Sequence, residues 1–142
     1  MFKWLFTLVI AVVISIIANL ANSADLTVIV ERVRNSNGEI RLAIFDTPDQ
    51  FPQGKNLDSK DVPAKLGEVT VHFEQLSPGI YAVAIHHDEN SDKKMNTNFI
   101  GWPQEGYGFS NDARVIFSSP VFEAASFDID SADKTIRLQL VY

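Results

Sequence analysis

The chain has 142 residues, a formal net charge of −6 and no cysteine. This length predicts a single domain. The lack of cysteine excludes disulfides, thiolate metal ligands, a cysteine nucleophile and a lipid-modified N-terminal cysteine, while the acidic balance argues against nucleic acid and anionic membranes as partners.

Residues 1–24 have the layout of a secretory signal peptide. Lys3 gives a positive start, an apolar run follows from Trp4 to about Leu20, and small residues precede Asp25. This predicts cleavage after Ser23 or Ala24 and export to the periplasm or the medium. The alternative is an uncleaved anchor, since the run is near the lower limit for a membrane span. Residues 25–142 would then carry 12 − 1 = 11 basic and 18 acidic residues, a net charge of −7, and no membrane association is expected.

The mature chain shows apolar and polar residues in alternation, as half-buried strands require. The alternating runs cover residues 26–31, 39–44, 68–74, 81–85, 127–129 and 135–142. Short strands with regular turns predict an all-β domain, a single antiparallel β-sandwich of about seven strands. The domain is expected to span residues 25–142.

The turns between these runs have recognisable chemistry. Asn37-Gly38 predicts a hairpin between the first two strands, and residues 75–79, with Pro78 and Gly79, predict a tight turn. Tyr81 follows this corner, and its hydroxyl is expected to bond back to the upstream backbone. Two long connections, 46–67 and 88–113, interrupt the regular spacing, and such connections are usually functional or locally folded.

The second connection opens with oxygen-bearing side chains at relative positions 1, 3, 5 and 9 of a calcium-type loop, namely Asp88, Asn90, Asp92 and Asn96. That spacing can wrap ligands around a hard cation. However, Lys93 occupies the position usually held by glycine, and Phe99 that of the bidentate glutamate. The alternative is an Asx-rich loop whose side chains bond their own backbone. Calcium is therefore a possible cofactor, and none is certain.

Histidines offer a second metal hypothesis. If His72 and His86 lie on paired neighbouring strands, both share one face, with His87 and Asp88 beside the loop. Zinc accepts imidazole and carboxylate ligands, but histidine is common on exposed strands and the spacing is not diagnostic.

Glycines and aromatic residues alternate further along this connection. Trp102, Tyr107 and Phe109 could line a shallow ligand groove, and Glu105 with Asp112 could act as acid and base. The alternative is a folded cap over one end of the sandwich. The chain has no Gly-x-Ser-x-Gly nucleophile elbow, no dinucleotide fingerprint and no phosphate-binding loop.

Three motifs make the chain similar to a known family. They are the corner from Leu76 to Val83, the run His87-Asp88-Glu89-Asn90, and the string from Gly101 to Asn111. Together they resemble DUF2141, a family of exported bacterial proteins of unknown function. The resemblance implies a transthyretin-like (prealbumin-like) β-sandwich and no known activity.

The resemblance also marks a special site, formed by Asp88, Glu89, Asn90, Glu105 and Asn111. The family usually has glycine at the position of Lys93 and aspartate at that of Asn96, so both departures weaken metal binding.

Three functions remain open at this point. The first is an exported, non-catalytic binding or accessory module, with residues 88–111 meeting a protein, a small molecule or an envelope polymer. The second is a structural domain whose calcium ion orders the loop. The third is a small hydrolase that uses Asp88 or Glu105 with a histidine.

Overall fold

The computed structural model describes residues 22–142. The predicted signal peptide lies outside these residues except for its last three positions. No helix within the described part is long and apolar enough to cross a membrane.

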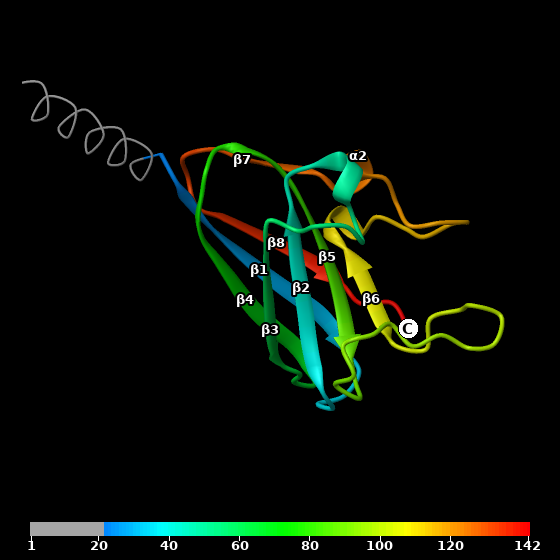
Figure 1. Ribbon diagram of the computed structural model, residues 1–142. Coiled ribbons are helices and arrows are strands. Elements are labelled where there is room, and N and C mark those ends of the chain that lie inside the picture. The colour runs from blue at the N-terminus through cyan, green and yellow to red at the C-terminus, as the bar shows by residue number, and fades with distance from the viewer. Residues whose placement is uncertain (1–21) are drawn as a thin grey trace, which may run out of the picture.

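The fold is a sandwich of two β-sheets, which Figure 1 shows as two layers facing each other. The smaller sheet has the order β4-β1-β8, formed by β1 (Ala24–Val33), β4 (Gly67–Leu76) and β8 (Lys134–Gln139). β1 runs antiparallel to β4 but parallel to β8. The prediction of an all-β sandwich is confirmed, whereas its wholly antiparallel pairing is wrong, because β8 enters beside β1 in the same direction.

The larger sheet has the order β3-β2-β5-β6, and β7 pairs with the start of β5. Its strands are β2 (Glu39–Phe45), β3 (Asp58–Pro63), β5 (Gly79–Asp88), β6 (Gly106–Phe109) and β7 (Phe127–Ile129). Within residues 22–142, three short helices complete the fold: η1 (Pro48–Gln50), η2 (Ser110–Asp112) and α2 (Phe122–Ala125).

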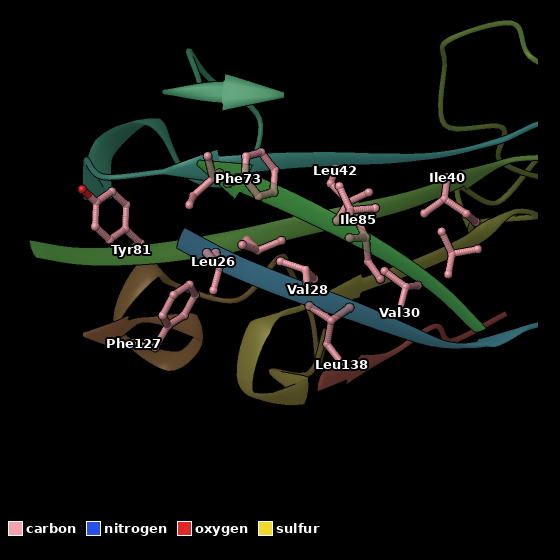
Figure 2. Close-up of a cluster of buried hydrophobic side chains, with 14 of the residues drawn as sticks. Leu26, Val28, Val30, Ile40, Leu42, Phe73, Tyr81, Ile85, Phe127 and Leu138 are labelled. Carbon is pink, nitrogen blue, oxygen red and sulfur yellow. The ribbon is translucent and has the colours of Figure 1, made fainter. Parts of the chain in front are cut away.

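The main hydrophobic core fills the space between the sheets, as Figure 2 shows with side chains from both layers pointing toward one another. β1 contributes Leu26, Val28 and Val30, all fully buried, and β2 contributes Ile40 and Leu42. The members of this core and of a smaller one around Phe45 lie between Ala24 and Leu140. Residues 24–142 therefore contain both sheets and both cores.

The corner between β1 and β2 is not the hairpin that Asn37-Gly38 predicts. Gly38 does adopt the left-handed conformation expected of such a turn, with φ of 64°. However, β1 pairs with β4 and β8, whereas β2 pairs with β3 and β5. The turn thus carries the chain from one sheet to the other, because both strands bury their apolar faces in the same core from opposite sides.

The corner before β5 agrees with its prediction. The Tyr81 hydroxyl donates a 2.6 Å hydrogen bond to the Ser77 carbonyl, which confirms the expected structural role of this tyrosine.

Both long connections contain a strand that sequence alternation missed. β3 lies at the sheet edge and is exposed along most of its length, so it has no apolar face to detect. β6 is short and has glycine at two of its four positions. Antiparallel backbone pairing with β5, rather than an alternating side-chain pattern, makes β6 a strand.

Candidate functional site

The outer face of the larger sheet, turned away from the core, carries two rows of side chains that cross four of its five strands, β3, β2, β5 and β6. The pairing register aligns the first row as Asp61, Arg41, His86 and Tyr107. The second row is Ser59, Ala43, Ala84 and Phe109. The first row is polar and the second has small residues at its centre.

These two rows form the floor of a groove of about 550 Å³. The groove exists because Ala43 and Ala84 leave the centre of the sheet uncovered, while larger side chains flank them. Three segments of chain form its rim: residues 52–56, residues 95–103 and residues 115–119. The concave surface therefore combines an apolar centre with polar groups at one end.

Arg41 and His86 provide the hydrogen-bonding groups at the polar end. The Arg41 Nε donates to Asp61 Oδ1 at 3.3 Å, and its terminal nitrogens have no hydrogen-bond partner among residues 22–142. His86 Nε2 lies 2.9 Å from Glu105 Oε2, and 16% of the His86 side chain is exposed. Arg41 can therefore present its terminal N–H groups to a bound molecule, whereas the Nε2–H of His86 is directed to Glu105 and Nδ1 is its other ring nitrogen.

Glu105 is nearly buried and holds His86 in place. Its Oε1 accepts a hydrogen bond from the Glu89 backbone N–H at 3.0 Å, and its Oε2 accepts one from the Asn96 N–H at 3.1 Å. The carboxylate thus joins β5, through His86, to both ends of the loop that follows β5. Its contacts make Glu105 a positioning residue for His86.

The Asp88 carboxylate also holds the backbone of this loop in place. It is fully buried, and its two oxygens accept hydrogen bonds from the backbone N–H groups of Asp92 (3.2 Å) and Lys93 (2.8 Å). Lys93 has φ of 63°, the left-handed conformation that usually favours glycine. The loop therefore keeps the sharp turn of a calcium-type loop even though a lysine occupies the turning position.

The remaining predicted calcium ligands bond to one another. Asn90 and Asn96 each donate a side-chain N–H to Asp92 Oδ2, at 3.2 and 3.1 Å. The Lys94 backbone N–H donates to the other oxygen of Asp92 at 2.8 Å. The Lys94 N–H, followed by the Asn96 side chain, lowers the pKa of Asp92 below its ordinary value. This arrangement matches the Asx-rich loop that the sequence left open.

A different set of residues is close enough to hold a metal ion. One ligand atom each from His86, Asp88 and Glu105 lies within 4.8 Å of the others. In the structure these atoms are engaged in the hydrogen bonds described above, so a cation would have to replace the bond between His86 and Glu105. His72 takes no part. It lies on β4 in the other sheet, beside Thr27, so the condition on which the zinc hypothesis depended, paired strands for His72 and His86, is not met.

His87 points into the core and is fully buried. Its Nε2 lies 2.8 Å from the Asn37 carbonyl and its Nδ1 lies 2.7 Å from the Tyr142 hydroxyl. The carbonyl can only accept, so Nε2 carries a hydrogen. The Tyr142 hydroxyl accepts from the Arg34 backbone N–H at 3.1 Å, which leaves its own hydrogen for Nδ1. Both ring nitrogens of His87 therefore have a hydrogen-bond partner.

Arg34 links the contacts of His87 and Tyr142 to Glu89. The Glu89 carboxylate accepts hydrogen bonds from the Arg34 guanidinium and, at 2.7 Å, from the Asn35 side chain. Burial raises the pKa of Glu89, but these hydrogen bonds and the positive charge of Arg34 outweigh it, so the pKa lies below its ordinary value. Burial raises the pKa of Tyr142, whose ring lies beneath the Arg34 guanidinium at 4.3 Å.

The six predicted ligand-binding residues lie in different parts of the structure and have different contacts. Tyr107 and Phe109 line the groove, and Trp102 is exposed on its neighbouring loop. Glu105 supports His86, as described above. Glu89 belongs to the Arg34 network. The Asn111 side chain donates to the Ser126 carbonyl at 2.7 Å, which ties η2 to the end of α2.

Sequence reasoning missed Arg41 and Asp61, the polar end of the groove, and the two alanines of its floor. Their signal was present in part: Arg41 occupies a polar position of an alternating strand, and Ala84 replaces the polar residue expected on the outer face of β5. The missing information was the register that aligns four strands.

Comparison with protein families gives one match. The family described as "Uncharacterized protein conserved in bacteria (DUF2141)" matches residues 28–137. Searches of curated proteins and of solved structures found no match.

Proposed function

Because the chain belongs to the DUF2141 family of uncharacterized bacterial proteins, we propose its function from geometry: a non-catalytic module that binds a small amphipathic molecule in the groove of the larger sheet. We propose that it acts outside the cytoplasm, as the N-terminal segment predicts.

The observation that carries this proposal is the alanine floor. Strand positions on a solvated face usually hold polar or large side chains, yet Ala43 and Ala84 occupy the outer face of β2 and β5 at the centre of the groove. Their small size leaves a concave surface of about 550 Å³, which lies within the range of ligand sites.

The lining indicates the chemistry of the ligand. Ala43, Ala84 and Phe109 offer an apolar surface at the centre. The free N–H groups of Arg41 at one end suit a hydrogen-bond acceptor such as a carboxylate or sulfonate. The proposed ligand therefore has an apolar body and one acidic or strongly polar end.

A specific observation also favours the hydrolase alternative: His86 lies in a concave site and Glu105 orients its Nε2 at 2.9 Å. A base of this kind needs a nucleophile or a bound water beside it. Among the described residues, none of the hydroxyl groups of the groove is hydrogen-bonded to His86. We therefore rank binding above hydrolysis.

The proposal is tested with residues 24–142 and the fluorescent anion 8-anilinonaphthalene-1-sulfonate, which has an apolar ring system and one sulfonate. We expect saturable binding at one site. Ala84→Leu should weaken binding at least about tenfold, because the larger side chain fills the floor. Arg41→Gln should weaken it several-fold. Ala124→Leu, an equal enlargement on the exposed face of α2, is the matched control.

Binding that is equally tight in wild type and Ala84→Leu would contradict the proposal. Hydrolysis of 4-nitrophenyl acetate that disappears in His86→Gln would favour the enzyme instead.

A further inference from the structure

Two segments project beside the groove, and Figure 1 shows both extending from the sandwich on the same side, next to β6. We call residues 93–104 the first loop and residues 113–121 the second loop. Both border the same groove, the first through Met95 and Pro103 and the second through Val115 and Ser119. They therefore flank one concave surface.

Both loops expose large apolar side chains. Phe99 in the first loop and Phe117 in the second are fully exposed, and Ile100, Trp102 and Ile116 are more than 60% exposed. Of the thirteen large exposed hydrophobic residues in the described chain, eight lie in these two loops. Scattered exposed apolar residues are normal, but such a concentration indicates an interaction surface.

The charge of these loops is opposite to that of the domain. They contain Lys93, Lys94 and Arg114 and no carboxylate, while Asp92, Glu105 and Asp112 lie directly beside their ends and Glu105 is buried. None of the three cations forms an ion pair with a carboxylate in the described part of the chain. The net charge of −7 predicts repulsion from anionic surfaces, but charges are screened beyond about 8 Å at physiological salt. The local positive charge therefore governs contact at the loops.

We propose that the two loops dock onto an anionic lipid surface. Phe99, Ile100 and Phe117 would enter the boundary between headgroups and acyl chains, and Trp102 would sit at that interface with its amphipathic ring. The three cations would meet the lipid phosphates. The combination of separate apolar tips with unpaired cations beside them fits a lipid surface, since a protein partner is usually met by a continuous, closely packed patch.

This inference does not depend on the groove holding a ligand. Docking would turn the rim of the groove toward the lipid, because the same loops form both. An amphipathic molecule could then reach the groove from the membrane.

The fluorescence of Trp102 can report docking of the loops onto lipid. The chain has two tryptophans, Trp4 and Trp102, so Trp102 is the single tryptophan of residues 24–142. With vesicles of phosphatidylcholine and phosphatidylglycerol, we expect this domain to co-sediment and the Trp102 emission to shift to shorter wavelength. Vesicles of phosphatidylcholine alone should bind it at least about tenfold more weakly, because each cation near an anionic surface adds to the attraction.

Two pairs of substitutions test the two parts of the surface. Phe99→Ser with Phe117→Ser should reduce binding at least about tenfold by removing the apolar insertion. Lys94→Gln with Arg114→Gln should remove most of the preference for anionic vesicles. The matched control is Leu66→Ser with Ile80→Ser, which changes two exposed apolar residues outside the loops. Thermal unfolding of each variant checks that the fold is intact.

Lack of binding to anionic vesicles would overturn the proposal, as would binding that the Phe99/Phe117 variant retains. Sedimentation velocity without lipid adds a further check. Self-association that is lost in the same variant, together with no vesicle binding, would assign the loops to a second copy of the chain. Loss of probe binding in Ala84→Leu with intact vesicle binding would separate the groove from this surface.

Discussion

At the scale of single residues, buried polar side chains explain how the ends of the strands are held together. His87 joins the β1–β2 corner, through the Asn37 carbonyl, to the C-terminal residue Tyr142. The Tyr142 ring packs directly on Gly106, where an added Cβ would lie 2.5 Å from it. The glycine that begins β6 is thus required by close approach of an aromatic ring, which belongs to the last residue of the sequence.

Glu89 provides a prediction about pH. Its pKa is lowered in the folded state from an ordinary value of 4.5, so the unfolded state binds more protons as the pH falls below that value. Its contribution to stability is therefore fully present above about pH 4.5 and is lost as the pH falls through the folded pKa. Glu89→Gln should reduce the free energy of unfolding by roughly 1–2 kcal/mol at neutral pH, because it loses charge-assisted hydrogen bonds from Arg34 and Asn35.

This difference should shrink at an acid pH below 4.5, as the pH falls through the lowered folded-state pKa of the Glu89 carboxyl. Urea unfolding at the two pH values measures it, with Glu123→Gln on the exposed surface of α2 as the control for net charge. A difference that is independent of pH would show that Glu89 stabilises the fold through packing alone.

At the scale of elements, β5 positions most of the site. Its inward residues Val83 and Ile85 belong to the main core, while Ala84 and His86 face the groove. The strand also ends in Asp88, whose buried carboxylate orders the following loop. One strand therefore supplies the core, the floor of the groove and the start of the projecting loop.

The end of β5 packs against the β1–β2 corner, and two glycines test this contact. A Cβ on Gly38 would lie 1.9 Å from the Asp88 carbonyl oxygen, whereas one on Gly67 would meet nothing within 4 Å. Both residues have positive φ, 64° and 94°. Gly67→Ala should cost about 1–2 kcal/mol of stability from backbone strain alone. Gly38→Ala should cost at least ~2 kcal/mol more, because the backbone must move.

Chemical denaturation of the two variants gives this comparison. Equal losses of stability would mean that the corner yields easily and is not fixed by the end of β5.

At the scale of the whole molecule, a domain without disulfides is stabilised by its two cores and by hydrogen-bonded loops. We expect metal ions to add little. Asp88, Asp92 and Glu105 already accept hydrogen bonds from backbone N–H groups, so the loop is ordered by the protein itself. The midpoint of thermal unfolding should be the same in chelator, in millimolar calcium and in zinc.

A cation that binds only the folded domain would raise this midpoint. With a Kd near 10 µM it would add roughly 2.7 kcal/mol at a concentration of 1 mM. A calcium-dependent rise that vanishes in Asp92→Asn would support the predicted calcium loop. A zinc-dependent rise that vanishes in His86→Gln would make His86, Asp88 and Glu105 a metal site.

The distribution of charge also matters at this scale. The acidic residues outnumber the basic ones overall, and from that balance alone the chain is expected to avoid anionic membranes. The fold gathers Lys93, Lys94 and Arg114 on two loops that project together, so the surface charge relevant to docking differs from the total.

The sequence by itself determined the fold class, most strand positions, the structural role of Tyr81 and membership of the family, because alternation, turn residues and motifs are local properties of the chain. It also identified the segment 88–111 as the region of interest. Only the tertiary structure decided that the Asn37-Gly38 corner crosses between sheets, that β8 runs parallel to β1, and that Asp61, Arg41, His86 and Tyr107 form one row. Those features depend on which strands pair and in which register, and pairing is decided by the burial of a shared core between residues far apart in the chain.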